Sequence, residues 1–131
     1  MKLANLTMHD QSALVSKFAS LGYEVNPTPL LREVSGTEDA IAAAHEAISA
    51  ARAQGAEGVL LGGRTDVCIY AATFAAFHGL HICVAETERV RDENDRFVFK
   101  LSGVTPLNVY WDYDGGNASG LKVDTDLPWQ K

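Results

Sequence analysis

Two patterns of apolar residues alternate along this chain: short apolar segments and longer stretches with helical spacing. The short segments predict strands at 2–7, 23–25, 58–63 and 80–86. Two of them, 58–63 and 80–86, have the continuous apolar character typical of strands buried in a parallel sheet. The longer stretches predict helices at about 11–21, 37–54 and 65–78.

Local signals support these boundaries. Asp10 is a preferred N-cap for the first helix, and a glycine follows each predicted helix. Pro27 and Pro29 predict an extended connection over residues 26–35, because proline also moves its predecessor out of the helical region.

Two of the predicted helices differ in how they should be buried. In the helix at 37–54, the residues Ile41, Ala44, Ile48 and Ala51 are expected to form the buried face. The helix at 65–78 is apolar almost all round, which predicts that it is covered on several sides.

The pattern changes after residue 86. A polar Asp-Glu-Asn-Asp turn at 92–95 and an alternating segment at 97–103 predict a closing hairpin. From Asn108 onward the chain carries tyrosines and tryptophans among Gly, Asn and Asp, with few aliphatic neighbours. We expect this aromatic tail to pack over the domain or a partner subunit.

The alternation of strands and helices is typical of the α/β class. We therefore predict a single Rossmann-like three-layer domain over residues 1–107, with a mostly parallel sheet and a C-terminal hairpin, followed by the aromatic tail at 108–131. A chain of 131 residues fits one domain.

Composition narrows the class of protein. With 47% hydrophobic residues the chain is not expected to be disordered, and no run of membrane-spanning length or signal peptide is evident. A cytoplasmic protein with no membrane partner is the expectation. The 17 acidic residues outnumber the 11 basic ones, for a net charge of −6, which argues against duplex nucleic acid as a partner. Residues 61–100 hold five of the cations, enough for a small anionic ligand.

Cysteine and histidine positions give little sign of metal chemistry. Cys68 and Cys83 lie in apolar segments and are expected in the core. His45, His78 and His81 are interpreted as structural. No pair of His, Cys, Asp or Glu has a convincing ligand spacing, so neither a metal nor a cofactor is expected.

Ligands of open α/β sheets bind at the carboxyl ends of the strands, beside helix N-termini. This rule selects three segments: Thr7–Gln11, Gly62–Asp66 and Glu86–Arg89.

The middle segment has the most informative residue types. Gly62 and Gly63 allow close backbone approach, Arg64 supplies a fork of N–H donors, and a helix begins at once near Thr65. Together they favour a cradle for one phosphate or another anion. The alternative is a tight turn in which Thr65 caps the helix and Arg64 is solvated.

The other two segments are each open to two interpretations. His9 is either a proton or hydrogen-bond donor to a ligand phosphate, or a surface histidine near a helix start. Glu86, Thr87 and Arg89 either present a carboxylate, a hydroxyl and a guanidinium to a ligand, or form a solvated turn.

The polar T-x-H-x-x-Q element after the first strand, the strand ending in Gly-Gly, and the E-T-E-R turn resemble small CRISPR-associated Rossmann-like proteins related to CARF domains. The resemblance covers residues 1–11, 57–66 and 80–103. It implies a compact homodimer that binds a cyclic oligoadenylate second messenger in antiviral defence, and in several such proteins cleaves it as a metal-independent ring nuclease.

Residue by residue, the resemblance implicates His9 and Gln11, then Gly62, Gly63, Arg64 and Thr65, then Thr87 and Arg89. Thr7 and Glu86 flank these positions and are included as ligand-binding candidates.

The resemblance also implies catalytic roles. His9 would donate a proton, and Arg64 or Arg89 would face the developing negative charge. The alternatives are a protein that sequesters the messenger without cleaving it, and a small nucleoside- or nucleotide-processing enzyme using Glu86 or Asp10.

Overall fold

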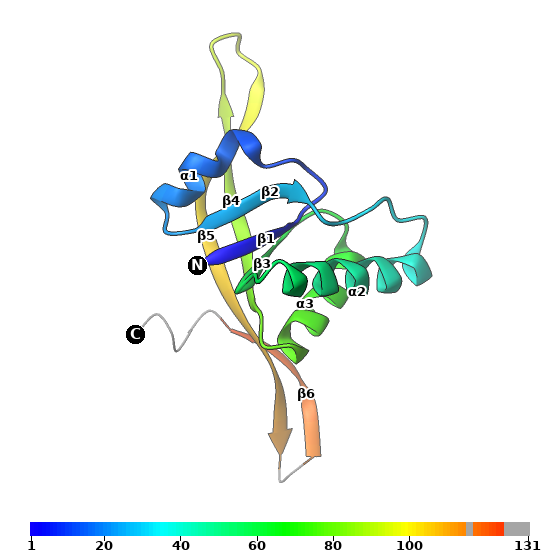
Figure 1. Ribbon diagram of the computed structural model, residues 1–131. Coiled ribbons are helices and arrows are strands. Elements are labelled where there is room, and N and C mark those ends of the chain that lie inside the picture. Colours follow the sequence, from blue (N-terminus) through cyan, green and yellow to red (C-terminus); the bar gives the residue numbers. More distant parts are fainter. Residues whose placement is uncertain (115–116, 125–131) are drawn as a thin grey trace.

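The computed structural model describes the backbone of residues 1–114 and 117–124, and the side chains of residues 1–108. Its elements, in chain order, are β1 (Lys2–Leu6), the 3-10 turn η1 (Ser12–Leu14), α1 (Val15–Ser20), β2 (Glu24–Pro29), α2 (Thr37–Ala53), β3 (Gly58–Leu61), α3 (Thr65–Phe77), β4 (His81–Arg91), β5 (Phe97–Asp114) and β6 (Asn117–Asp124) (Figure 1). None of these helices is long and apolar enough to cross a membrane.

The predicted α/β class is confirmed. The strands are ordered β2-β1-β3-β4-β5, with β1 parallel to both β2 and β3 and with β3 parallel to β4. β5 pairs antiparallel with β4, as the predicted hairpin requires. The first five strands thus form a mostly parallel sheet, in which β1 and β3 end at the same edge and β4 runs on past it.

β5 is much longer than the predicted segment and crosses the expected boundary at residue 107. Its second half, from Asn108, pairs antiparallel with β6. How the aromatic side chains of the tail pack lies outside the described residues.

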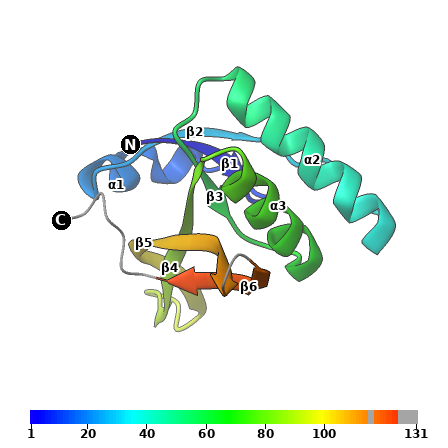
Figure 2. The same ribbon diagram turned by 90° about the horizontal axis from the view of Figure 1, so that it is seen from below.

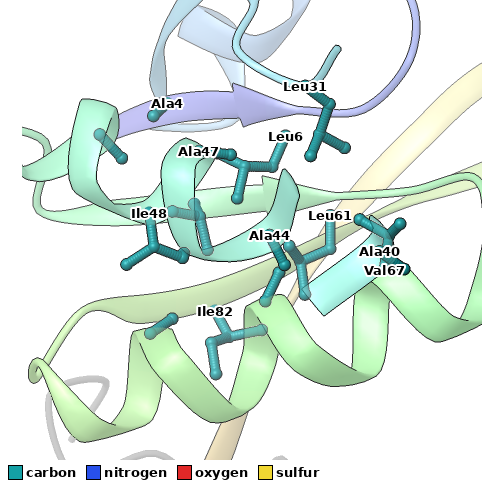
Figure 3. Packing of buried hydrophobic residues seen from close by; sticks show 14 residues of the cluster. Ala4, Leu6, Leu31, Ala40, Ala44, Ala47, Ile48, Leu61, Val67 and Ile82 are labelled. Atoms are coloured by element: carbon teal, nitrogen blue, oxygen red, sulfur yellow. The ribbon is translucent and has the colours of Figure 1, made fainter. Parts of the chain in front are cut away.

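Successive residues of each strand contribute to two hydrophobic cores on opposite faces of the sheet, because neighbouring side chains in a strand point to opposite sides. Ala4, Leu61 and Ile82 point toward α2 and α3 (Figure 3). Their immediate neighbours Leu3, Leu60 and Cys83 pack on the other face with Phe18 of α1. α2 and α3 lie side by side over their face, and α1 covers the other (Figure 2).

The predictions about helix burial are confirmed only in part. In α2, Ala44, Ile48 and Ala51 are buried as predicted, whereas Ile41 is exposed. The helix also buries Ala40, Ala43 and Ala47, whose small side chains let it approach α3 and the sheet closely. The prediction that α3 is covered on several sides is wrong: the helix buries one stripe, Val67, Ala71 and Ala75, while Ile69 is 58% and Phe77 is 82% exposed.

The predicted connection at 26–35 is partly a strand, since β2 runs through both prolines. Proline is tolerated there because, among the strands that the structure describes, β2 lies at the edge of the sheet beside β1.

β4 continues well past the point where its neighbour β3 stops. β3 ends its pairing at Leu61, opposite Val84, whereas β4 runs on to Arg91 and pairs there only with β5. A bulge between Glu86 and Thr87 marks the change. Residues 87–101 thus form a two-stranded arm, which projects beyond the carboxyl edge of the parallel strands (Figure 1).

Candidate functional site at the carboxyl edge of the sheet

The loop after β1 is organised by a buried asparagine that the sequence interpretation did not single out. Asn5 is fully buried, and its side-chain nitrogen donates to the carbonyl oxygens of His9 and Pro27, at 2.8 Å each. Its side-chain oxygen accepts from the backbone N–H and the hydroxyl of Thr7, at 2.9 and 2.6 Å. All polar atoms of this amide are thus hydrogen-bonded, as a buried polar group requires. Because its partners lie in both segments, the Asn5 side chain joins the β1 loop to β2.

Thr7 and Gln11 belong to the same network. The Thr7 hydroxyl oxygen accepts from the Gln11 side-chain amide at 3.0 Å and from the His9 backbone N–H at 3.3 Å. These two predicted ligand-binding residues therefore hold the loop in shape. The backbone of His9 is fixed at both its N–H and its carbonyl, while its side chain is exposed.

The structure brings the first and second predicted segments together. A Cβ atom added at Gly62 would lie 3.3 Å from the Thr7 side chain, and one added at Gly63 would lie 3.3 Å from that of Met8. Gly63 also has a φ of +97°, a conformation that other residues rarely adopt. The glycines are therefore needed for close approach of the two loops as well as for the turn.

Arg64 is held by an acidic neighbour. Its Nε donates to Asp66 at 2.8 Å, and the Asp66 carboxylate also accepts from Thr37 at the start of α2 and from the backbone N–H of Val67. The Arg64 hydrogen bond lowers the pKa of Asp66, so the carboxylate stays ionised. The contact uses Nε, so the two terminal guanidinium nitrogens remain as further donors. Thr65 is the first residue of α3 and not its N-cap; Arg64 holds the N-cap position and makes no side-chain capping hydrogen bond.

A pocket of about 430 Å³ opens beside this turn, between α3 and the sheet. Gly62, Gly63 and Thr65 form one end of it. Its walls are apolar side chains of α3, β4 and β5, namely Cys68, Ile69, Ala72, Ile82, Val84, Ala85 and Leu107, and it reaches Leu61 at the end of β3. The volume lies within the usual range for small-molecule sites, roughly 300–1,000 Å³. We call it the β3–α3 pocket.

The third predicted segment is only partly at this edge. Ala85 lines the β3–α3 pocket, and the Glu86 carboxylate next to it accepts a hydrogen bond from Thr105 of β5 at 2.7 Å. Thr87 and Arg89 lie in the arm instead, and at ~3.3 Å per residue Arg89 is about 10 Å along the strand from Glu86. The Arg89 guanidinium stacks on the ring of Phe97, 3.9 Å from its centroid.

The two cysteines are poor nucleophiles. Burial raises the pKa of Cys83 to about 11, and it also raises the pKa of Cys68. Both thiols therefore stay protonated at neutral pH. Within residues 1–114 and 117–124, no three His, Cys, Asp or Glu side chains come together as a metal site.

No protein-family model matches this chain, and neither does any curated protein.

Proposed function

We propose that this protein is a Rossmann-like, CARF-related homodimer that binds a cyclic oligoadenylate messenger of prokaryotic antiviral defence and cleaves it without a metal. The observation that carries the proposal is the meeting of the β1 loop with the Gly62-Gly63 turn at the carboxyl edge, next to the β3–α3 pocket. Such an edge offers backbone N–H groups to a phosphate, and an apolar pocket suits a nucleobase.

The proposed reaction is an internal transesterification. A ribose 2′-hydroxyl releases its proton to solvent water and attacks the adjacent phosphorus, the bond from phosphorus to the 5′ oxygen breaks, and a 2′,3′-cyclic phosphate forms. The leaving 5′ oxygen takes up a proton, for which His9 is the proposed donor. Arg64 is the proposed cation beside the phosphoryl oxygens, because its terminal nitrogens are not used by Asp66.

One observation favours the sequestering alternative. Arg89 is engaged with Phe97 in the arm, and Arg64 is paired with Asp66, so each of the two expected catalytic cations already has a neighbour. The engagement of both guanidinium groups leaves less positive charge free to face the negative charge that develops in the transition state. Sequestration without turnover would use the same β1 loop and glycine turn.

Incubation of the protein with cyclic tetra-adenylate in EDTA, with separation of the products, tests these possibilities. Linear products that end in a 2′,3′-cyclic phosphate are the expected result. Tight binding without products would favour sequestration. Absence of binding would overturn both and leave the nucleoside-processing alternative, in which Glu86 or Asp10 performs the chemistry.

A further inference from the structure

The two faces of the arm differ in composition. Residues that pair across its strands share a face, and successive residues of a strand alternate between the faces. One face therefore carries two guanidinium groups and two aromatic rings, in the pairs Arg91–Phe97 and Arg89–Phe99. Glu88, the one acid in the paired strand segments, lies on the opposite face. We call the first of these the Arg–Phe face.

Both rings of the Arg–Phe face are open to solvent. Phe97 is 52% and Phe99 is 77% exposed. The guanidinium groups of Arg89 and Arg91 lie over the Phe97 ring, 3.9 and 4.5 Å from its centroid. A guanidinium that stacks on a ring keeps its N–H edge for a phosphate, so Phe97 positions two sets of donors. Phe99 makes no ring or cation contact within residues 1–108, which leaves its ring open for stacking.

The positive charge of this face continues onto α1. A hollow of about 390 Å³ lies at the foot of the arm, and Phe99 of the arm and Lys17 of α1 both line it. Residues 12–20, which form η1 and α1, contain no acid. The exposed ring of Phe99 and a cation from another element therefore border the same hollow.

Two cations of this surface are not neutralised by an acid. Arg91 forms an ion pair with Asp95 at 2.6 Å. Within residues 1–108, neither Arg89 nor Lys17 pairs with an acid. The surface thus combines an open ring with two available positive charges.

This combination selects among polyanions. Duplex nucleic acid is bound chiefly through its phosphates, usually by six or more cations, and its base faces are hidden in the helix stack. Two cations are too few for that. A single strand exposes its base faces, and stacking of one base on an aromatic side chain contributes about 5- to 150-fold in affinity.

We propose that the Arg–Phe face binds single-stranded nucleic acid, with a base stacked on Phe99 and phosphates beside Arg89 and Lys17. An anionic membrane surface fits the arm less well, because the tip that would enter it carries Asp92, Glu93 and Asp95. The site lies outside the β1 loop, the glycine turn and the β3–α3 pocket, so it goes beyond the proposed function and can hold or fail independently of it.

Fluorescence anisotropy of a short labelled oligouridylate, titrated with the full chain, tests the proposal. Uridylate is used so that binding does not report on the proposed adenylate site. The wild type is expected to bind this strand at low salt, and to bind its duplex with oligoadenylate more weakly. Phe99→Ala is expected to weaken single-strand binding about 5- to 150-fold. The matched control is Phe77→Ala, an exposed phenylalanine on α3, which is expected to leave the affinity unchanged.

The salt dependence separates charge from stacking. Two cations predict a slope of about −1.4 for the logarithm of the binding constant against the logarithm of salt concentration, at about 0.7 per phosphate contact of a single strand. Arg89→Ala and Lys17→Ala are each expected to flatten the slope by about 0.7, whereas Phe99→Ala leaves it unchanged. Lys2→Ala is the control cation, because Lys2 begins β1 at the other end of that strand from the β1 loop.

Circular dichroism checks that each variant folds. A wild type that does not bind the strand, equal affinities of Phe99→Ala and Phe77→Ala, or an equal preference for the duplex would each overturn the proposal. Binding to phosphatidylserine vesicles without binding to the oligouridylate would overturn it as well, and would assign the face to a membrane surface.

Discussion

At the scale of single residues, Asn5 decides the shape of the candidate site. Its side chain makes four hydrogen bonds from inside β1, and these fix Thr7, His9 and the end of β2. A polar group that is buried without a hydrogen-bond partner costs free energy, so the buried amide and its partners depend on one another.

Replacement of Asn5 by Ala is therefore expected to lower the free energy of unfolding by about 2–3 kcal/mol, since it removes four hydrogen bonds and leaves the buried backbone N–H of Thr7 without its acceptor. Urea denaturation measures this. The control is Asn26→Ala, whose side chain is exposed and makes a 3.3 Å contact with Gln54. Equal stability of the two variants would show that the network does not hold the loop.

His9 is the residue on which the proposed chemistry depends. His9→Ala is expected to slow single-turnover cleavage of cyclic tetra-adenylate by ~10²–10⁴-fold with ligand affinity nearly unchanged, because only the backbone of His9 supports the loop. The wild-type rate is expected to survive EDTA. Equal losses of binding and rate would make His9 a ligand clamp, and a wild-type rate would assign proton donation elsewhere.

The buried thiol of Cys83 predicts a loss of stability at alkaline pH. Its pKa is raised to about 11 by burial, above the ordinary thiol value of 9.0. Between these values the unfolded chain gives up a proton that the folded protein keeps, so unfolding becomes easier as the pH rises. One such group contributes a slope of up to about 1.4 kcal/mol per pH unit. Chemical denaturation from pH 8 upward should show that the free energy of unfolding falls less steeply with pH for Cys83→Ala than for the wild type. Equal slopes for the two proteins would contradict a raised pKa at Cys83.

At the scale of elements, the start of β3 is the tightest point of the sheet. A Cβ atom at Gly58 would lie 2.8 Å from the carbonyl oxygen of His81 and 2.9 Å from the Leu3 side chain. Backbone from β4 cannot move aside without disturbing the register of β3 with both of its neighbours.

Gly58→Ala is therefore expected to destabilise the fold by roughly 1–3 kcal/mol, the usual cost of overpacking. Gly36→Ala is the control, because nothing lies within 4 Å of its added methyl group and its backbone is extended. Thermal unfolding of the two variants makes the comparison, and a tolerant Gly58 would mean that β3 and β4 can separate locally.

At the scale of the whole molecule, the proposed dimer predicts how ligand and protein associate. A ring bound on its twofold axis gives one cyclic tetra-adenylate per two chains. Isothermal titration calorimetry is expected to find this ratio for the wild type. A ratio of one ring per chain would place the whole site within a single copy.

The sequence by itself determined the α/β class, the order of strands and helices, and the hairpin after residue 86, because these follow from local periodicity and turn chemistry. It also placed the β1 loop and the Gly62-Gly63 turn at strand ends. Tertiary structure alone decided that these two loops touch and that Asn5 joins the β1 loop to β2. It also decided that Arg89 lies in the arm and stacks on Phe97, away from the carboxyl edge. The reason is that β4 continues past the end of β3 and pairs there with β5. Contacts of this kind depend on how far each strand continues past its neighbour, and no local pattern of residues specifies that length.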